Sequence, residues 1–161
     1  MDEEPVCYKV GFPNIKGSDH TFFDCDNNLW VCGKGNARKL GLGDCKDCHI
    51  LTPIPNIKAL KVSSRYYHTM VIDIDNNVYS CGYYKNLGLN DLSEPGTDYI
   101  STLTQIPNIK GKQISTGYYY SLLTDINNNV WEIRKNVTII PNLKASHIAC
   151  GYDYNIVIGA K

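Results

Sequence analysis

The first stretch whose residue types could do chemistry is the C-x-x-C-H string from Cys45 to His49. Its spacing is that of covalent haem attachment, and it also suits two thiolates and an imidazole on zinc. Haem attachment needs export and a second axial ligand, and a structural zinc site needs a fourth ligand, for which the candidates are Cys7, Cys25 and Cys32. No second paired ligand cluster is present. We therefore favour a polar loop with two free thiols, and we expect no cofactor and no metal.

A second pattern, Asp-x-Asp/Asn-x-Asn, begins at Asp24, Asp73 and Asp125. Alternating oxygen side chains of this kind form the first half of a calcium loop, which also needs Gly at its sixth position and Glu at its twelfth. All three copies lack both residues. Because Asn and Asp tolerate the positive φ angles of tight turns, we interpret the pattern as a recurring hairpin turn.

Enzymatic chemistry has little support in the sequence. His20 and His68 occupy the same position of a repeat, which favours an architectural role, and the other histidines are His49 and His147. The chain has no Gly-x-Ser-x-Gly elbow, no phosphate-binding Gly loop and no His-Glu-x-x-His motif. We therefore expect a protein that is not an enzyme.

Charge and hydropathy exclude two further classes. The 161 residues carry 16 basic and 16 acidic side chains, so the formal net charge is zero. This argues against a protein that neutralises nucleic-acid phosphates over its whole surface, although Arg38 leaves room for local contact. No run approaches the about 18 apolar residues that cross a bilayer, so we expect no membrane segment.

Composition also bears on location. Residues 1–5 lack the basic and apolar regions of a secretory signal, so we expect an intracellular protein, cytoplasmic or nuclear, whose seven cysteines are free thiols. Asn, Ile, Lys and Tyr are abundant, and they share codons rich in A and T. Such usage is typical of a protist or of a large DNA virus, which extends the expected location to a host cell or a virion.

The elements that position these residues follow from an internal repeat. A Pro-Asn-Ile/Leu-Lys string begins at Pro13, Pro55, Pro107 and Pro141, with spacings of 42, 52 and 34 residues. A longer string follows each copy: His or Tyr, then Ser, Thr or Asn, an apolar run, the Asp/Asn turn and a second apolar run. The fourth copy stops after its first apolar run.

Each repeat of roughly 50 residues reads as about four short strands. The proline string supplies one strand, a segment such as Lys61–Ser64 supplies the next, and the two arms of the hairpin supply the others, for example Thr69–Ile74 and Val78–Cys81. No window has a helical period. Four antiparallel strands at this period are typical of a β-propeller blade. We predict an all-β fold of about three to three and a half four-stranded blades.

The ordered motifs resemble the repeat of the regulator of chromosome condensation (RCC1-like) family, from about Phe12 to Ile158. The residues that carry the resemblance are His68-Thr69, Asp75–Asn77, Val78–Gly82, Leu87–Leu89, Trp30–Gly33 and Leu40–Gly43. Three features depart from the family pattern. Asn replaces the turn Gly in every turn, Tyr120 and Tyr154 replace His, and the third repeat lacks the Leu-Gly-Leu loop.

The resemblance implies one domain over residues 1–161, with repeats at about 6–53, 54–106 and 107–140 and a partial repeat at 141–161. Family members form a seven-bladed ring, for which this chain is too short, so an open arc with exposed sheet edges is expected. We hypothesise that Val6–Gly11 completes the partial blade of another copy, head to tail, to give a homo-oligomer. The alternatives are an arc capped by its own side chains and a piece of a larger assembly.

Candidate partner-binding residues lie in the long loops and at one recurring position after the short strand. Tyr and Arg dominate interface hot spots, so an unidentified protein is the expected partner. The alternative is that the tyrosines fill the space between blades. The candidates are Arg38, Lys39, Arg65, Tyr66, Tyr67, Tyr83, Tyr84, Tyr118, Tyr119 and Tyr152.

The function predicted from the sequence is a non-enzymatic protein-interaction scaffold that self-associates through its open ends. The resemblance implies one alternative, since the founding family member is a guanine-nucleotide exchange factor that also binds nucleosomes. A second alternative is a structural component of a virion or filament.

Overall fold

The computed structural model describes residues 16–18, 21–23, 26–90 and 95–160. Over these ranges the fold is all-β, and its strands form one antiparallel series in which each strand pairs with the next along the chain. Two short 3-10 turns, η2 (Asn36–Arg38) and η3 (Tyr84–Asn86), lie in the loops. The strands are β1 (Lys16–Ser18), β2 (Thr21–Phe23), β3 (Asn28–Gly33), β4 (Cys48–Arg65), β5 (His68–Asp73), β6 (Asn77–Tyr83), β7 (Tyr99–Thr116), β8 (Ser121–Asp125), β9 (Asn129–Ile133), β10 (Val137–Cys150) and β11 (Asn155–Gly159).

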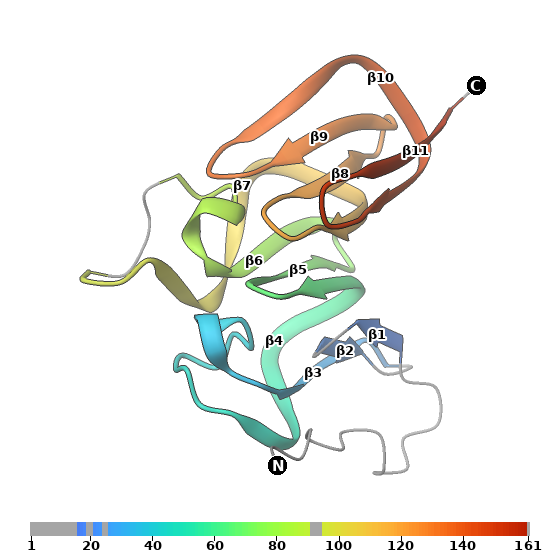
Figure 1. Cartoon of the computed structure of the whole chain (residues 1–161). Helices are drawn as coiled ribbons and strands as arrows, with labels where there is room; N and C mark the ends of the chain where they lie inside the picture. The colour runs from blue at the N-terminus through green and yellow to red at the C-terminus, as the bar shows by residue number, and fades with distance from the viewer. Residues whose placement is uncertain (1–15, 19–20, 24–25, 91–94, 161) are drawn as a thin grey trace.

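Three long strands divide this series into blades, because each belongs to two of them. β4 pairs with β3 as far as Lys58 and with β5 from Ala59 onward. β7 changes partner after Lys110, and β10 changes partner after Lys144. The result is three four-stranded blades followed by a half-blade made of the end of β10 and β11 (Figure 1). The predicted all-β fold of about three to three and a half four-stranded blades is confirmed.

The change from one blade to the next occurs at the Pro-Asn-Ile/Leu-Lys string. Its Asn has φ of 66° at Asn56, 60° at Asn108 and 60° at Asn142, which turns the strand sharply without breaking it. The Lys then reaches back to the hairpin turn of the blade that is ending. Lys58 Nζ lies 2.6 Å from Asn28 Oδ1, and Lys110 has the same contact with the corresponding Asn of the next blade. The two repeated strings of the sequence therefore meet in space.

The Asp/Asn pattern forms the hairpin turns of the second and third blades, while Asp24 of the first copy lies outside the described residues. In the second blade, one oxygen of Asp73 accepts the backbone N–H groups of Asp75 and Asn77, and its other oxygen accepts the Asn77 amide. The middle residue, Asn76, has φ of 63°. Asp125 organises the third-blade turn in the same way. The carboxylate oxygens are thus occupied by the turn itself, in agreement with the turn interpretation and not with a calcium loop.

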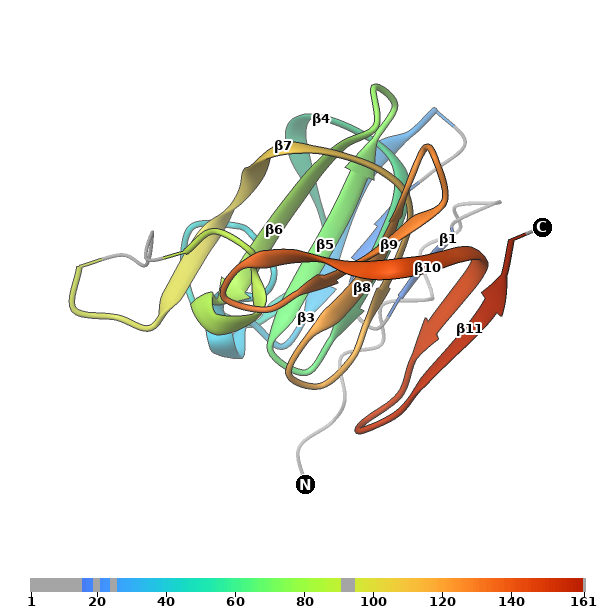
Figure 2. The same cartoon turned by 90° about the horizontal axis from the view of Figure 1, so that it is seen from above.

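The apolar core lies between the blades. One cluster joins the first and second blades, a second joins the second and third, and a smaller third cluster lies between the third blade and the half-blade. Seen from above, the half-blade hairpin lies beside the third blade (Figure 2). Each blade buries its faces against its neighbours, and this stacking of the repeats fixes the positions of the surface residues.

The Leu-Gly-Leu loops fasten the first blade to the second and the second to the third. Leu87 and Leu89 are buried, and Gly88 between them has φ of 70° and donates its N–H to Arg134 O of the following blade. In the first blade, Leu40 of the Leu-Gly-Leu-Gly loop is buried, and Gly43 donates its N–H to Ser101 O of the second blade. The third blade has instead a tight turn in which Arg134 N donates to Asn136 O, as expected from its short connection.

The described cysteines correct one expectation. Cys45, Cys48, Cys81 and Cys150 are free thiols as predicted, but Cys32 is disulfide-bonded. Its partner lies outside the described residues, as does the N-terminal segment Val6–Gly11 that we expected to complete a blade. No helix in the part of the chain that the structure describes is long and apolar enough to cross a membrane.

Candidate functional site

A row of tyrosines crosses three successive blades. Tyr66, Tyr118 and Tyr152 each follow the innermost strand of their blade, at the ends of β4, β7 and β10. The ring centroids of Tyr66 and Tyr118 are 4.7 Å apart, and those of Tyr118 and Tyr152 are 4.3 Å apart. Residues at one register position of the repeat are therefore in direct contact, as expected for neighbouring blades.

A second row lies beside the first. The rings of Tyr67 and Tyr119 are stacked with centroids 6.4 Å apart, and the Tyr67 hydroxyl lies 3.0 Å from that of Tyr118. Tyr119 also meets the Tyr118 ring edge-on at 4.4 Å. Edge-to-face and offset contacts of this kind stabilise one another and hold the rings in fixed positions.

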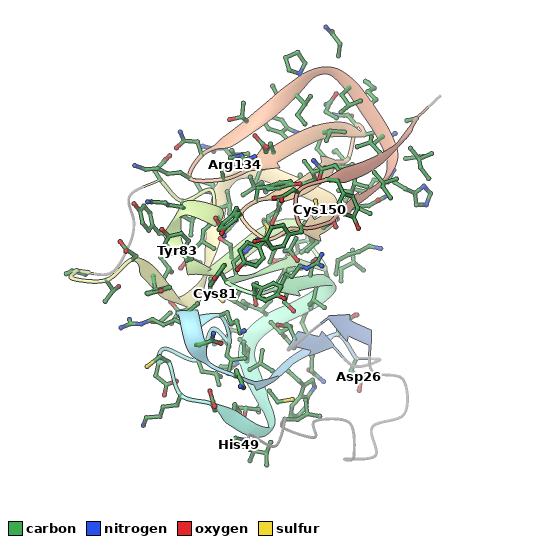
Figure 3. The ribbon with its side chains drawn as sticks, viewed as in Figure 1. Asp26, His49, Cys81, Tyr83, Arg134 and Cys150 are labelled. Carbon is green, nitrogen blue, oxygen red and sulfur yellow. The ribbon has the colours of Figure 1, made fainter. Side chains whose placement is uncertain are left out.

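The aromatic surface continues toward the long loop of the second blade. Tyr83 contacts Tyr67, Tyr84 and Tyr99, with ring centroids 5.6–6.4 Å apart. Lys85 Nζ lies within 6 Å of the Tyr83 and Tyr84 ring centroids. Figure 3 shows rings gathered between the labels of Tyr83 and Cys150. We call this continuous set the tyrosine surface: Tyr66, Tyr67, Tyr83, Tyr84, Tyr99, Tyr118, Tyr119 and Tyr152.

Exposure separates the two interpretations left open by the sequence. Tyr66 is 54% exposed, Tyr119 48% and Tyr152 49%, whereas the other rings of the surface are half-buried. The half-buried rings pack within and between blades. The exposed rings rest on them and present large areas to solvent, so the tyrosine surface combines a packed base with an accessible outer layer.

Two of the basic candidates, Arg65 and Lys39, make hydrogen bonds beside the tyrosine surface. Arg65 Nη1 donates to Cys150 O at 3.2 Å, which ties the second blade to the half-blade. Lys39 Nζ donates to Tyr66 O at 3.2 Å. Arg38 lies in η2 with φ of 54°. The structure thus gives Arg65 and Lys39 intramolecular partners next to the tyrosines.

The hydroxyls of Tyr118 and Tyr119 stay protonated at physiological pH. The hydrogen bond from Tyr67 is the main cause that raises the pKa of Tyr118 well above its ordinary value. Partial desolvation, followed by the neighbouring Tyr152, raises the pKa of Tyr119. The exposed Tyr119 therefore offers a neutral hydroxyl group, which both donates and accepts hydrogen bonds.

A buried contact beneath the surface fixes the second blade on the third. His68 Nε2 lies 2.7 Å from Ser121 Oγ, and Asn86 Nδ2 lies 3.4 Å from His68 Nδ1 and the same distance from Tyr118 O. Complete burial lowers the pKa of His68 to about 4, so its ring is neutral. The architectural role predicted for His68 is confirmed. No sequence pattern marks Asn86, because the residue before the Leu-Gly-Leu loop of the first repeat is Lys39.

Tyr120, which stands in the same position of the third repeat, makes the corresponding contact with the half-blade. Its hydroxyl donates to Asn155 Oδ1 at 2.8 Å, and the Arg134 guanidinium lies 4.8 Å from its ring centroid. Asn155 occupies the register position of Ser121. The replacement of His by Tyr thus keeps the link between blades, with a longer side chain that spans the gap.

The C-x-x-C-H string lies away from the tyrosine surface, where Figure 3 labels His49 at the far end of β4. Cys48 Sγ lies 2.9 Å from Thr52 Oγ1 and 3.0 Å from Ile50 O, and Cys45 is exposed. Within the described ranges no group of three His, Cys, Asp or Glu side chains is placed to hold a metal ion. The disulfide at Cys32 removes that residue as a fourth thiolate.

Comparison with solved structures decides which propeller the blades belong to. The chain superposes on human WBSCR16 with a TM-score of 0.76 and on Prp20p of Saccharomyces cerevisiae with 0.78, at 14% and 15% identity. A chain in the crystal structure of Kap60 bound to yeast RCC1 (Prp20) gives 0.73 at 14% identity. The chain has an RCC1-like fold.

The match covers nearly all of this chain but less than half of each solved structure. Between 93% and 96% of the chain is aligned, against 46%, 44% and 43% of the three structures in the order given above. A scan against models of known protein families and a search of curated proteins find no match. The assignment of an RCC1-like half propeller therefore rests on structural similarity, and the sequence motifs agree with it.

Proposed function

We propose that this chain is a non-enzymatic binding module that holds a protein partner on the tyrosine surface. One observation carries the proposal: tyrosines of three successive blades form a single packed layer with three exposed rings. Tyr offers a large contact area at low entropic cost, because only two side-chain torsions must be fixed. Here the ring contacts within the layer restrict these torsions before a partner binds.

The solved structures support a protein as the partner class. The structure of Prp20p was described together with its binding to Gsp1p and histones, and yeast RCC1 (Prp20) was solved bound to Kap60. The neutral net charge of this chain and the neutral hydroxyls of Tyr118 and Tyr119 favour a partner recognised by aromatic packing over one recognised by charge.

Site-specific photo-crosslinking tests the proposal. A photoreactive phenylalanine placed at Tyr119 should give discrete protein adducts in extracts of the source cells. The same probe at Ile74, an exposed residue of the second-blade turn, is the matched control and should give none of these adducts. Identical adduct patterns at the two positions, or no adduct at Tyr119, would show that the tyrosine surface is not a binding site.

A second candidate function is nucleotide exchange, which the fold shared with Prp20p brings into consideration. The measurement is release of a fluorescent guanine nucleotide from a small GTPase of the Gsp1p type, with and without the chain. We expect no acceleration, since less than half of the Prp20p length is matched. Acceleration that Tyr119→Ser abolishes would establish exchange and identify the surface that performs it.

A further inference from the structure

The rings of the tyrosine surface touch one another. The ring centroid of Tyr118 lies 4.7 Å from that of Tyr66 and 4.3 Å from that of Tyr152, and Tyr119 meets the same ring at 4.4 Å. A cation that enters an aromatic cage needs a gap between the rings, and rings in contact leave none. The surface therefore suits a partner segment that lies across the rings, since nothing can be inserted between them.

The exposed rings are spaced for an extended segment. Tyr66 and Tyr152 are both about half exposed, and each contacts Tyr118, so their own centroids are at most about 9 Å apart. The polyproline II helix rises about 3.1 Å per residue and has three residues per turn, so the same side of it recurs about every 9 Å. Residues i and i+3 of such a segment can therefore rest on Tyr66 and Tyr152 together.

The hydroxyl groups of the surface have a proton to donate to such a segment. The hydroxyls of Tyr67 and Tyr118 lie 3.0 Å apart, and the Tyr119 hydroxyl interacts in turn with those of Tyr118 and Tyr152. Four hydroxyls joined in a row by three hydrogen bonds use three of their four protons and keep one. The carbonyl oxygens of a polyproline II segment have no internal hydrogen bonds, so one of them can accept this proton.

The charges beside the rings favour a neutral segment. Single-stranded nucleic acid also stacks on aromatic rings, but it needs cations that follow its backbone. Arg65 and Lys39 donate to backbone carbonyl oxygens, and Lys85 lies over two tyrosine rings. Asp153, directly after Tyr152, is exposed and adds a carboxylate next to the row. An uncharged extended peptide therefore fits this surface better than a phosphate backbone.

We infer that the tyrosine surface binds a proline-rich segment of its protein partner in the polyproline II conformation. This inference rests on the proposed function and specifies the chemistry that the partner presents. Proline-rich segments dock on aromatic side chains, and a segment that is already extended loses little entropy when it binds. Prolines three positions apart lie on Tyr66 and Tyr152, and a carbonyl oxygen between them accepts a hydrogen bond from the row of hydroxyls.

Fluorescence anisotropy of a fluorescein-labelled decaproline peptide, titrated with the full chain, tests this inference. We expect saturable binding below 1 mM, and no binding of a Gly-Ser peptide of the same length. Tyr66→Ser and Tyr152→Ser should each raise the dissociation constant at least fivefold. Ile126→Ser, at an exposed residue of the third-blade turn, is the matched control and should leave the dissociation constant unchanged. No saturable binding of decaproline, or equal effects of Tyr66→Ser and Ile126→Ser, would overturn the inference.

Two measurements on the unaltered chain complete the test. Excess decaproline should suppress the protein adducts that form at a photoreactive Tyr119 position. If those adducts form and persist in excess decaproline, the proposed function stands and this inference alone is overturned. An oligothymidylate of ten nucleotides is the nucleic-acid probe. We expect it to bind more weakly than decaproline, and tighter binding of the oligothymidylate would overturn the assignment of a proline-rich ligand.

Discussion

At the scale of single residues, His68 is an ionisable side chain that the fold removes from solvent. It is completely buried between the second and third blades, and desolvation lowers its pKa from the ordinary 6.5 to about 4. In the unfolded chain the ring takes up a proton as the pH falls through 6.5, whereas in the folded chain it does so only near pH 4. The folded state therefore loses stability as the pH falls between these two values.

The first prediction follows from this difference. His68 should lower the free energy of unfolding by about 1.4 kcal/mol for each pH unit below 6.5. This contribution should level off near pH 4. Urea unfolding at several pH values measures it. His68→Gln should remove this contribution to the slope, and His147→Gln, at an exposed histidine, should not. Equal slopes in all three proteins would show that His68 titrates normally.

The turn asparagines give a second prediction at this scale. Asn76 has φ of 63°, a conformation in which Gly is at ease and Ala is strained. Asn76→Gly should leave the free energy of unfolding nearly unchanged, while Asn76→Ala should lower it by about 1 kcal/mol. Asn127→Ala, next to the positive-φ residue of the third-blade turn, serves as the control. Equal effects of Gly and Ala at position 76 would contradict the left-handed turn.

At the scale of elements, the loops and strands that link neighbouring blades hold the blades in place. Gly88 combines a positive φ with close packing: a Cβ placed there would lie 2.7 Å from Val137 Cγ2. Gly96 has nearly the same φ but no atom within 4 Å of such a Cβ. The two glycines therefore separate backbone strain from crowding between blades.

We predict that Gly88→Ala lowers the free energy of unfolding by about 3 kcal/mol, and Gly96→Ala by about 1 kcal/mol. The backbone strain is common to both, so the difference measures the contact of the Leu-Gly-Leu loop with the third blade. Thermal and urea unfolding of the two variants provides the comparison. If Gly88→Ala costs no more than Gly96→Ala, the loop does not fasten the second blade to the third.

The half-blade gives a further prediction. The Tyr120 hydroxyl bonded to Asn155 is one of its links to the third blade, and the net value of such a bond is about 1 kcal/mol. Tyr120→Phe should speed hydrogen exchange of the β11 amides about fivefold and leave β5 unchanged. Tyr119→Phe is the matched control. Unchanged exchange in β11 would mean that other contacts hold the half-blade.

The sequence predicted well those elements that recur in every repeat. Four copies of the proline string and three hairpin turns predicted the blades, and the common register of Tyr66, Tyr118 and Tyr152 predicted their place on one rim. The contacts between Lys58 and Asn28 and between His68 and Ser121 were not predicted. They join residues 30 and 53 positions apart, and no local pattern specifies which side chains meet at such a separation.

At the scale of the whole molecule, the RCC1-like fold appears as an open half of a ring. Apolar clusters between neighbouring blades hold them together, and the tyrosine surface provides the accessible aromatic area. The matched region is less than half of each solved structure, so the partners of those proteins come to this chain only as proposals.

The central claim is that the tyrosine surface is where the partner binds. The most direct measurement is the dissociation constant for the crosslinked partner, determined by isothermal titration with a Tyr66→Ser/Tyr119→Ser/Tyr152→Ser triple variant. These rings are exposed, so the fold should persist, and we predict binding at least 100-fold weaker, a loss of about 2.7 kcal/mol. An Ile74→Ser/Ile126→Ser variant should bind like the unaltered chain. Unchanged affinity of the triple variant would contradict the account.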